Sequence, residues 1–174
     1  MYLRLFLLFA FLGCAHSSSH QESRLDLVSN SKILKVGTTF DYPPFSYRDT
    51  NGNPKGSDID MASSLARGLG VKLVLVQTTW KDLLKDLSQN KFDIAMGGIS
   101  KRLTRQKQGL FSTSYMNNGK LPISRCSNRE LFASLKKIDQ AHVKLIVNPG
   151  GTNYKYAKKN IRKAKVILHQ DNNT

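Results

Sequence analysis

The stretch ILKVGTTFDYPPF, residues 33–45, decides the fold of this chain. Its first five residues form a short apolar run that ends at Gly37, a pattern typical of a strand buried on both faces of a sheet. Pro43 and Pro44 then stop any regular element, so the strand leads into a stiff loop that presents aromatic rings. A buried strand of this kind indicates a parallel sheet and an α/β protein.

Strands and helices alternate in the residues that follow. After turn residues at 51–54, the expected elements are a helix at 58–69, a strand at 72–78, a helix at 82–90 and a strand at 92–96. Asp58 is the expected cap of the first helix and Gly70 its stop. This βαβαβ order predicts a parallel sheet with right-handed crossovers in a first lobe at residues 32–121.

The pattern resumes in a second lobe at residues 122–174. A strand at 144–148 leads into PGGT at 149–152, and a strand follows at 166–168. The intervening helix is expected to place Tyr154, Ala157, Ile161 and Ala164 on one face. Its opposite face is basic and comprises Lys155, Lys158, Lys159, Arg162 and Lys163. A solvated surface and a binding role are both open for this basic face.

The N-terminus predicts export. Arg4 precedes an apolar run at residues 5–12 and then small residues, the layout of a secretory signal peptide at residues 1–15. Cleavage after Ala15 and a lipobox that places a lipid on Cys14 are both compatible with this layout. Residues 16–31 are polar and rich in serine, and we interpret them as a tether. We therefore expect a periplasmic protein whose membrane contact is limited to a lipid on Cys14.

The length and charge of the chain limit its domain organisation and its possible partners. The chain has 174 residues, enough for one ordinary domain or two small lobes, and its formal net charge is +15. Residues 1–100 carry 11 basic and 9 acidic side chains, whereas residues 101–174 carry 16 and 3. This basic half is compatible with an anionic partner, and export makes nucleic acid an unsuitable one. The sequence does not determine the oligomeric state.

The side chains predict neither a metal site, nor a Ser-His-Asp triad, nor a carboxylate pair for acid–base catalysis. The four histidines do not cluster with cysteines or carboxylates, and no Ser-His-Asp arrangement or close carboxylate pair is present. If Cys14 is cleaved off or lipidated, Cys126 remains alone. We interpret Cys126 as a buried thiol, with a disulfide partner outside this sequence as the alternative.

Four segments follow strand ends, where ligands bind in open parallel sheets. They are residues 41–45, 97–100, 100–105 and 148–153. The glycines at 97 and 98 let a ligand reach the backbone, and Ser100 can donate a hydrogen bond. Arg105 offers a bidentate grip on a carboxylate. Segment 148–153 ends at a helix N-terminus, which can hold an anion. Each segment also has a structural alternative. The aromatic rings of 41–45 would pack in the core, 100–105 would be only a basic loop, and 148–153 would be a tight turn without a ligand.

The segments, in this order, resemble the extracellular solute-binding proteins of family 3. The matching stretches are KVGTT at 35–39, GSDID at 56–60 and FDIAM at 92–96. A narrower resemblance is to the periplasmic cyclohexadienyl dehydratases, carried by QTTW at 77–80, DIAMGGIS at 93–100, NGKLPI at 118–123 and IVNPGGTN at 146–153. The resemblance implies a type II periplasmic-binding-protein fold with two lobes. It also implies conversion of prephenate or arogenate to phenylpyruvate or phenylalanine without a cofactor.

The dehydratase resemblance also implies roles for individual residues. Lys120 and Asn148 would be catalytic and would position the leaving hydroxyl or carboxylate. The implied substrate-binding residues are Asp41, Tyr42, Trp80, Gly98, Ser100, Arg105, Thr152 and Asn153.

Such proteins continue beyond the point that corresponds to Thr174. We therefore expect a C-terminally truncated chain with an incomplete second lobe and impaired activity. The alternative function is an amino-acid-binding protein of an ABC transporter.

Overall fold

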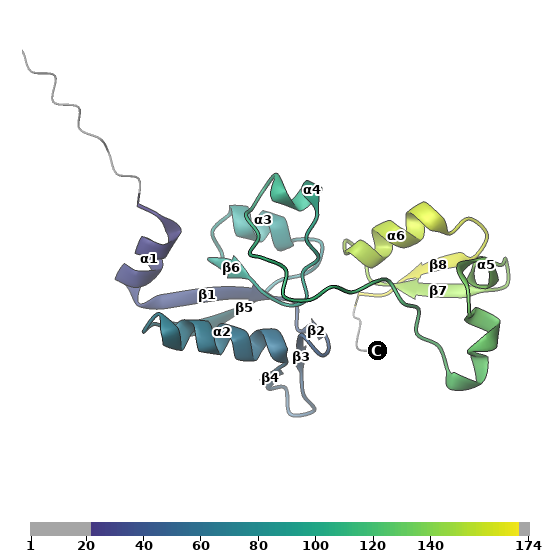
Figure 1. Cartoon of the computed structure of the whole chain (residues 1–174), viewed down its shortest axis with the longest axis horizontal. Coiled ribbons are helices and arrows are strands. Elements are labelled where there is room, and N and C mark those ends of the chain that lie inside the picture. The colour runs from purple at the N-terminus through teal and green to yellow at the C-terminus, as the bar shows by residue number, and fades with distance from the viewer. Residues whose placement is uncertain (1–21, 171–174) are drawn as a thin grey trace, which may run out of the picture.

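The protein has two lobes joined by an extended segment. The computed structural model describes residues 22–170. Figure 1 shows the first lobe in purple to teal and the second in green to yellow, with one long crossing between them. Residues 116–125 have no regular secondary structure. The boundary that the sequence places between residues 121 and 122 falls within this stretch.

A parallel sheet organises the first lobe, as the sequence predicts. β1 (Ile33–Thr38) is central, with β5 (Lys72–Gln77) on one side and β6 (Ile94–Ala95) on the other. Both pairings are parallel, with Val36 opposite Leu75 in one and Ile94 in the other. Parallel neighbours need crossover connections, and helices supply them.

Helices cover both faces of this sheet. In Figure 1, α2 (Ser57–Gly68) lies on one face and α3 (Leu83–Ser88) on the other. Leu34 and Val36 point to the same face because strand side chains alternate, and they form one buried cluster with Ala62 and Ala66 of α2. The small alanines let the helix approach the sheet closely.

A small antiparallel sheet follows β1 and was not anticipated. It contains β2 (Asp41–Tyr42), β3 (Ser46–Arg48) and β4 (Pro54–Lys55), in that order. Strands of two or three residues are too short to show an alternating pattern. The turn predicted at 51–54 is confirmed, because the Asp49 carboxylate accepts hydrogen bonds from the backbone N–H groups of Asn51 and Asn53 at 2.9 and 2.8 Å.

The tether predicted at residues 16–31 is wrong in its second half. Residues 24–31 form α1 (Arg24–Ser31), which begins with a capping box between Ser23 and Asp26. Val28 of this helix is 4% exposed and belongs to the core of the sheet. Capping and one buried contact therefore hold a segment whose serine-rich composition indicates a linker. The predicted signal peptide and Cys14 lie outside the described residues.

The predicted cap of α2 is also wrong. Gly56 is the N-cap residue, and Asp58 lies in the first turn of the helix with its side chain fully buried. The first N–H groups of the helix instead donate to carbonyl oxygens of the proline loop: Ser57 to Pro44, and Asp58 to Phe45, both at 3.0 Å. The Asp58 carboxylate is thereby available for other partners.

The second lobe repeats the strand-helix-strand arrangement. Its parallel strands are β7 (Lys144–Val147) and β8 (Lys165–Leu168), and its helices are α5 (Leu135–Ile138) and α6 (Thr152–Asn160), preceded by 3₁₀ turns η1 (Cys126–Asn128) and η2 (Glu130–Phe132). The buried residues are Ile138, Val143, Ala157, Ile161 and Ala164.

The basic helix face is shorter than predicted because α6 ends at Asn160. Beyond it, Asp139 accepts hydrogen bonds from the backbone N–H groups of Arg162, Lys163 and Ala164 at 2.6 to 3.0 Å. These bonds turn the chain out of the helix and into β8. Ile161 and Ala164 are buried as predicted but lie outside the helix.

The buried thiol predicted at Cys126 is wrong, because this side chain is exposed. It lies in η1, next to the irregular connecting segment, where no core forms around it. Within residues 22–170, no helix is long and apolar enough to cross a membrane.

We predict that Gly37→Ala lowers the free energy of unfolding by about 1–3 kcal/mol, because overpacking a core has a cost of this order. A Cβ atom at residue 37 would lie 2.5 Å from ring atoms of the fully buried Phe92. Urea unfolding followed by circular dichroism measures the change.

Gly68→Ala is the matched control, because a Cβ atom there would meet nothing within 4 Å. This substitution at the end of α2 should leave stability unchanged or raise it by up to about 1 kcal/mol. Equal effects of the two variants would contradict the packing argument.

Candidate functional site

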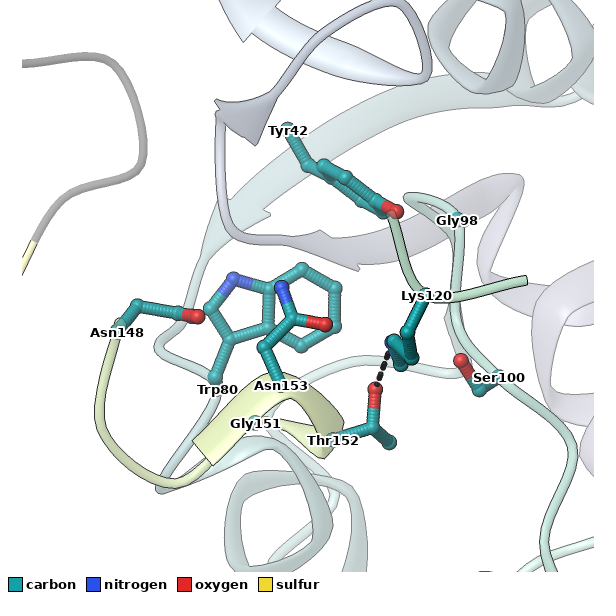
Figure 2. A pocket seen from close by; sticks show the side chains of 9 residues that line it. All are labelled: Tyr42, Trp80, Gly98, Ser100, Lys120, Asn148, Gly151, Thr152 and Asn153. Atoms are coloured by element: carbon teal, nitrogen blue, oxygen red, sulfur yellow. Dashed lines mark hydrogen bonds between the residues drawn. The ribbon is translucent and has the colours of Figure 1, made fainter. Parts of the chain in front are cut away.

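A hollow lies between the two lobes. Its volume is about 280 Å³, and the residues that line it are Tyr42, Trp80, Gly98, Ser100, Lys120, Asn148, Gly151, Thr152 and Asn153. Figure 2 shows these side chains converging from both lobes and from the connecting segment. None of the nine carries a carboxylate.

The site lies at the carboxyl ends of parallel strands, as the sequence predicts. Trp80 follows β5, Gly98 and Ser100 follow β6, and Asn148 follows β7. Because the strands in each lobe are parallel, the loops at these ends meet on one side of each sheet. The segments identified at residues 97–100 and 148–153 are thereby brought together from different lobes.

Trp80 forms one wall, and Asp41 holds it in place. The indole Nε1–H donates to both carboxylate oxygens of Asp41, at 2.9 and 3.0 Å. Tyr42 packs edge-on against the Trp80 ring, with centroids 5.8 Å apart. Asp41 therefore lies behind the wall and does not line the hollow, in contrast to the direct role that the family resemblance implies.

The backbone of Gly98 lies against the aromatic rings of Tyr42 and Phe45. Its φ angle is +64°, and a Cβ atom there would lie 2.8 Å from ring atoms of Tyr42 and Phe45. Only glycine accommodates both the left-handed conformation and this contact. The backbone of residue 98 is therefore part of the surface that a ligand would touch.

Lys120 bridges the two lobes. From the connecting segment its ammonium group donates to the Thr152 hydroxyl at 2.7 Å, shown by the dashed line in Figure 2. Burial lowers the pKa of Lys120, and the positive charges of Arg102 and Arg105 lower this pKa further. Because a nearby anion would relieve this repulsion, the site favours negatively charged ligands.

Asn148 is nearly buried, at 4% exposed, and its Oδ1 atom accepts no hydrogen bond. In Figure 2 this side chain extends toward Trp80 at the edge of the hollow. A buried acceptor without a donor is unfavourable by about 1–3 kcal/mol. A ligand with a hydroxyl or another donor would satisfy it.

The backbones of the two lobes come close together beside Asn148. A Cβ atom at Gly150, where φ is +76°, would lie 2.6 Å from the Cα atom of Lys81 in the first lobe. Gly151 is the N-cap residue of α6, and it packs against the Asn148 amide and the Trp80 ring. Two consecutive glycines thus let the two backbones come together.

Arg105 lies behind Ser100 and does not line the hollow. It is 7% exposed, and its Nη1 donates to the Ser100 carbonyl oxygen at 3.0 Å. The bidentate carboxylate grip predicted for Arg105 is therefore not arranged in this structure. Its charge acts on the site through Lys120.

The structure brings eight of the ten predicted site residues to one hollow, all except Asp41 and Arg105. Their functional roles stay predictions. The lining residue missing from the predicted site residues is Gly151, which lies within the segment 148–153 that the sequence identifies as an anion-binding candidate. Among the described residues, no group of three or more His, Cys, Asp or Glu side chains is arranged to hold a metal ion.

Comparison with known proteins identifies a matching family. The family model described as bacterial extracellular solute-binding proteins, family 3, matches residues 34–171. A cyclohexadienyl dehydratase of Pseudomonas aeruginosa is 52% identical over 88% of this chain. The chain spans 58% of the length of that relative.

Two solved structures of reconstructed ancestral proteins are similar as well. One is an ancestral amino-acid-binding protein described as a precursor of cyclohexadienyl dehydratase, with 38% identity and a TM-score of 0.82 over 86% of this chain and 66% of its own. The other is an ancestral cyclohexadienyl dehydratase, with 49% identity and a TM-score of 0.55 over 87% of this chain and 63% of its own.

We predict that Arg102→Gln raises the pKa of Lys120 toward its ordinary value, because removal of a nearby positive charge stabilises the ammonium form. An NMR titration of the lysine side-chain carbons measures this pKa. Arg162→Gln is a control that removes an exposed arginine of the second lobe and should leave the Lys120 titration unchanged. Identical titration curves in wild type and Arg102→Gln would contradict the electrostatic coupling.

Proposed function

The chain belongs to the bacterial extracellular solute-binding proteins of family 3, and from this membership we propose that it is of the cyclohexadienyl dehydratase type. The proposed reaction converts prephenate to phenylpyruvate, or arogenate to phenylalanine. The observation that carries the proposal is the meeting of Lys120 and Asn148 in one hollow without a carboxylate. The 52% identity to the Pseudomonas dehydratase supports it.

The electrostatics of the hollow suit such a substrate. Prephenate carries two carboxylates, and the site offers the Lys120 ammonium group, the N-terminus of α6 at Thr152 and the positive charges of Arg102 and Arg105. Tyr42 and Trp80 provide an aromatic corner, with ring planes 80° apart, against which a six-membered ring can pack. The carboxylates and the ring of the substrate are thus both matched by residues in or beside the hollow.

The proposed chemistry is a decarboxylative elimination. The bond between the ring and its carboxylate breaks, and carbon dioxide leaves. The electron pair makes the ring aromatic and expels the hydroxyl group, which takes up a proton and departs as water. Aromatisation drives the reaction, so the proposal includes no cofactor.

Lys120 and Asn148 have distinct roles in this proposal. The lowered pKa of Lys120 makes its ammonium group a stronger acid than an ordinary lysine, and this suits a hydrogen bond to the departing hydroxyl. The unpartnered Oδ1 atom of Asn148 accepts a hydrogen bond from the same hydroxyl before it leaves. Ser100, Thr152 and Asn153 orient the carboxylates. Asp41 acts through Trp80.

Amino-acid binding without chemistry is the second candidate function. It is favoured by the similarity to the ancestral amino-acid-binding protein, whose TM-score of 0.82 exceeds that of the ancestral dehydratase. The two functions differ in whether prephenate is consumed.

The proposal also includes export of the protein to the periplasm. Residues 1–15 are proposed as a signal peptide that delivers the protein to the periplasm, with cleavage after Ala15 or lipidation of Cys14 as the two outcomes. The intact mass of the protein purified from its native cells distinguishes these outcomes. A mass that includes residues 1–15 unmodified would contradict both.

Trp80 makes the main experiment direct, because it is the single tryptophan of the chain and lines the hollow. We predict that prephenate changes the tryptophan fluorescence in a saturable way and that phenylpyruvate accumulates in the same samples. Lys120→Met should lower phenylpyruvate formation at least 100-fold, since removal of a hydrogen-bonding group at the reacting atoms has an effect of this order.

Lys159→Met is the matched control, because Lys159 is an exposed residue of α6 outside the hollow. It should leave turnover unchanged. Saturable binding of an amino acid with prephenate left intact would favour the second candidate function. Unchanged turnover in Lys120→Met would remove Lys120 from the mechanism.

A further inference from the structure

Asp58 is a buried carboxylate outside the hollow, and one of its partners, Gly98, lines that hollow. Its side chain is fully buried in the first turn of α2. Its Oδ2 atom accepts two short hydrogen bonds, one from the Gly98 backbone N–H and one from the Tyr115 hydroxyl, both at 2.7 Å. Its Oδ1 atom accepts from the Ser57 hydroxyl at 3.5 Å.

The backbone of the same residue holds a third segment. The Asp58 N–H donates to the Phe45 carbonyl oxygen at 3.0 Å, which fixes the proline loop against the start of α2. Phe45, Gly98 and Tyr115 all line a second hollow of about 950 Å³ that shares Tyr42, Gly98, Ser100 and Lys120 with the first. One buried residue thus joins three separate parts of the cleft lining.

The bond to Tyr115 bears on Lys120 through the chain itself. Tyr115 lies five residues before Lys120, and the residues between them have no regular secondary structure. Burial raises the pKa of Tyr115, and the hydrogen bond to Asp58 raises it further, so the hydroxyl remains a donor. The connecting segment is therefore held at Tyr115 by Asp58 and at Lys120 by Thr152.

We propose that Asp58 is a positioning residue that holds the Gly98 backbone and the Lys120-bearing segment in register with each other beside the ligand cleft. The proposal rests on the proposed function only for the identity of the ligand. A carboxylate suits this role because its two partners are both donors that meet one oxygen atom. An asparagine could keep one oxygen at the same place, but it lacks the negative charge that strengthens both hydrogen bonds and it turns its NH₂ group toward the Ser57 side, so the bonds to Gly98 and Tyr115 would both be weakened.

The experiment combines a measurement that needs a ligand with two that do not. Wild type, Asp58→Asn and Tyr115→Phe are compared in prephenate affinity by Trp80 fluorescence, in hydrogen exchange of peptides containing Gly98 and residues 111–121, and in quenching of Trp80 by iodide. Tyr115→Phe removes only the hydroxyl of a side chain that is 54% exposed, so it tests the proposal even if Asp58→Asn does not fold.

We expect Asp58→Asn to weaken prephenate binding about tenfold and Tyr115→Phe about fivefold, as the loss of hydrogen bonds to a buried charge predicts. Exchange should accelerate at Gly98 in Asp58→Asn, and at residues 111–121 in both variants. The double variant should resemble Asp58→Asn, because both changes break the same bond. Tyr156→Phe, which alters a tyrosine of α6 outside both hollows, is the control and should match wild type.

The outcomes separate this inference from the proposed function. Wild-type exchange rates in both variants would overturn the positioning role, and so would faster exchange with unchanged prephenate affinity. If wild type itself does not bind prephenate, the proposed function fails. Hydrogen exchange and iodide quenching, which need no ligand, then test the role of Asp58. Faster exchange together with altered Trp80 quenching in the variants supports this role. A wild-type value of either quantity overturns it.

Discussion

The parallel pairing of β1 with both β5 and β6 is the constraint on which the rest of the first lobe depends. Parallel neighbours cannot be joined by tight turns, so the chain must cross over the faces of the sheet, where α2 and α3 lie. The three strands of this sheet then end at the same edge. The second lobe repeats this arrangement with β7 and β8, and the hollow forms where the two edges face each other.

Carboxylates in this protein serve the fold more than they neutralise its charge. Asp41 accepts from Trp80, Asp58 from Gly98 and Tyr115, and Asp139 from three backbone N–H groups. Among residues 22–170 only two ion pairs form, Arg24 with Asp93 and Lys91 with Asp86, and both lie in the first lobe. The lining of the hollow itself has no carboxylate, and Lys120 lies there under the influence of the positive charges of Arg102 and Arg105.

The sequence predicted the strands well because their signal is local. Short apolar or alternating runs predicted β1, β5, β6 and β7 to within one or two residues at most ends. The partners of Asp58, Asp41 and Arg105 were not predicted, for a different reason. A carboxylate at a helix start looks like a cap, but its partner Tyr115 is 57 residues away along the chain, a distance that no local pattern encodes. Likewise, the Trp80 indole reaches Asp41 across 39 residues. The convergence of the site was predictable from topology and family resemblance, whereas the partners of its supporting groups were not.

The contact between Gly150 and Lys81 has a consequence for how closely the two lobes can fit together. The backbones meet there without an intervening side chain, with room for no Cβ atom at residue 150. Any larger residue at 150 would clash with the Lys81 backbone and hold the lobes apart. The free energy of that clash would oppose closure of the cleft around a ligand. A single methyl group at this position would therefore tune the balance between capture and release without touching the ligand. Evolution or design could adjust that balance independently of ligand recognition.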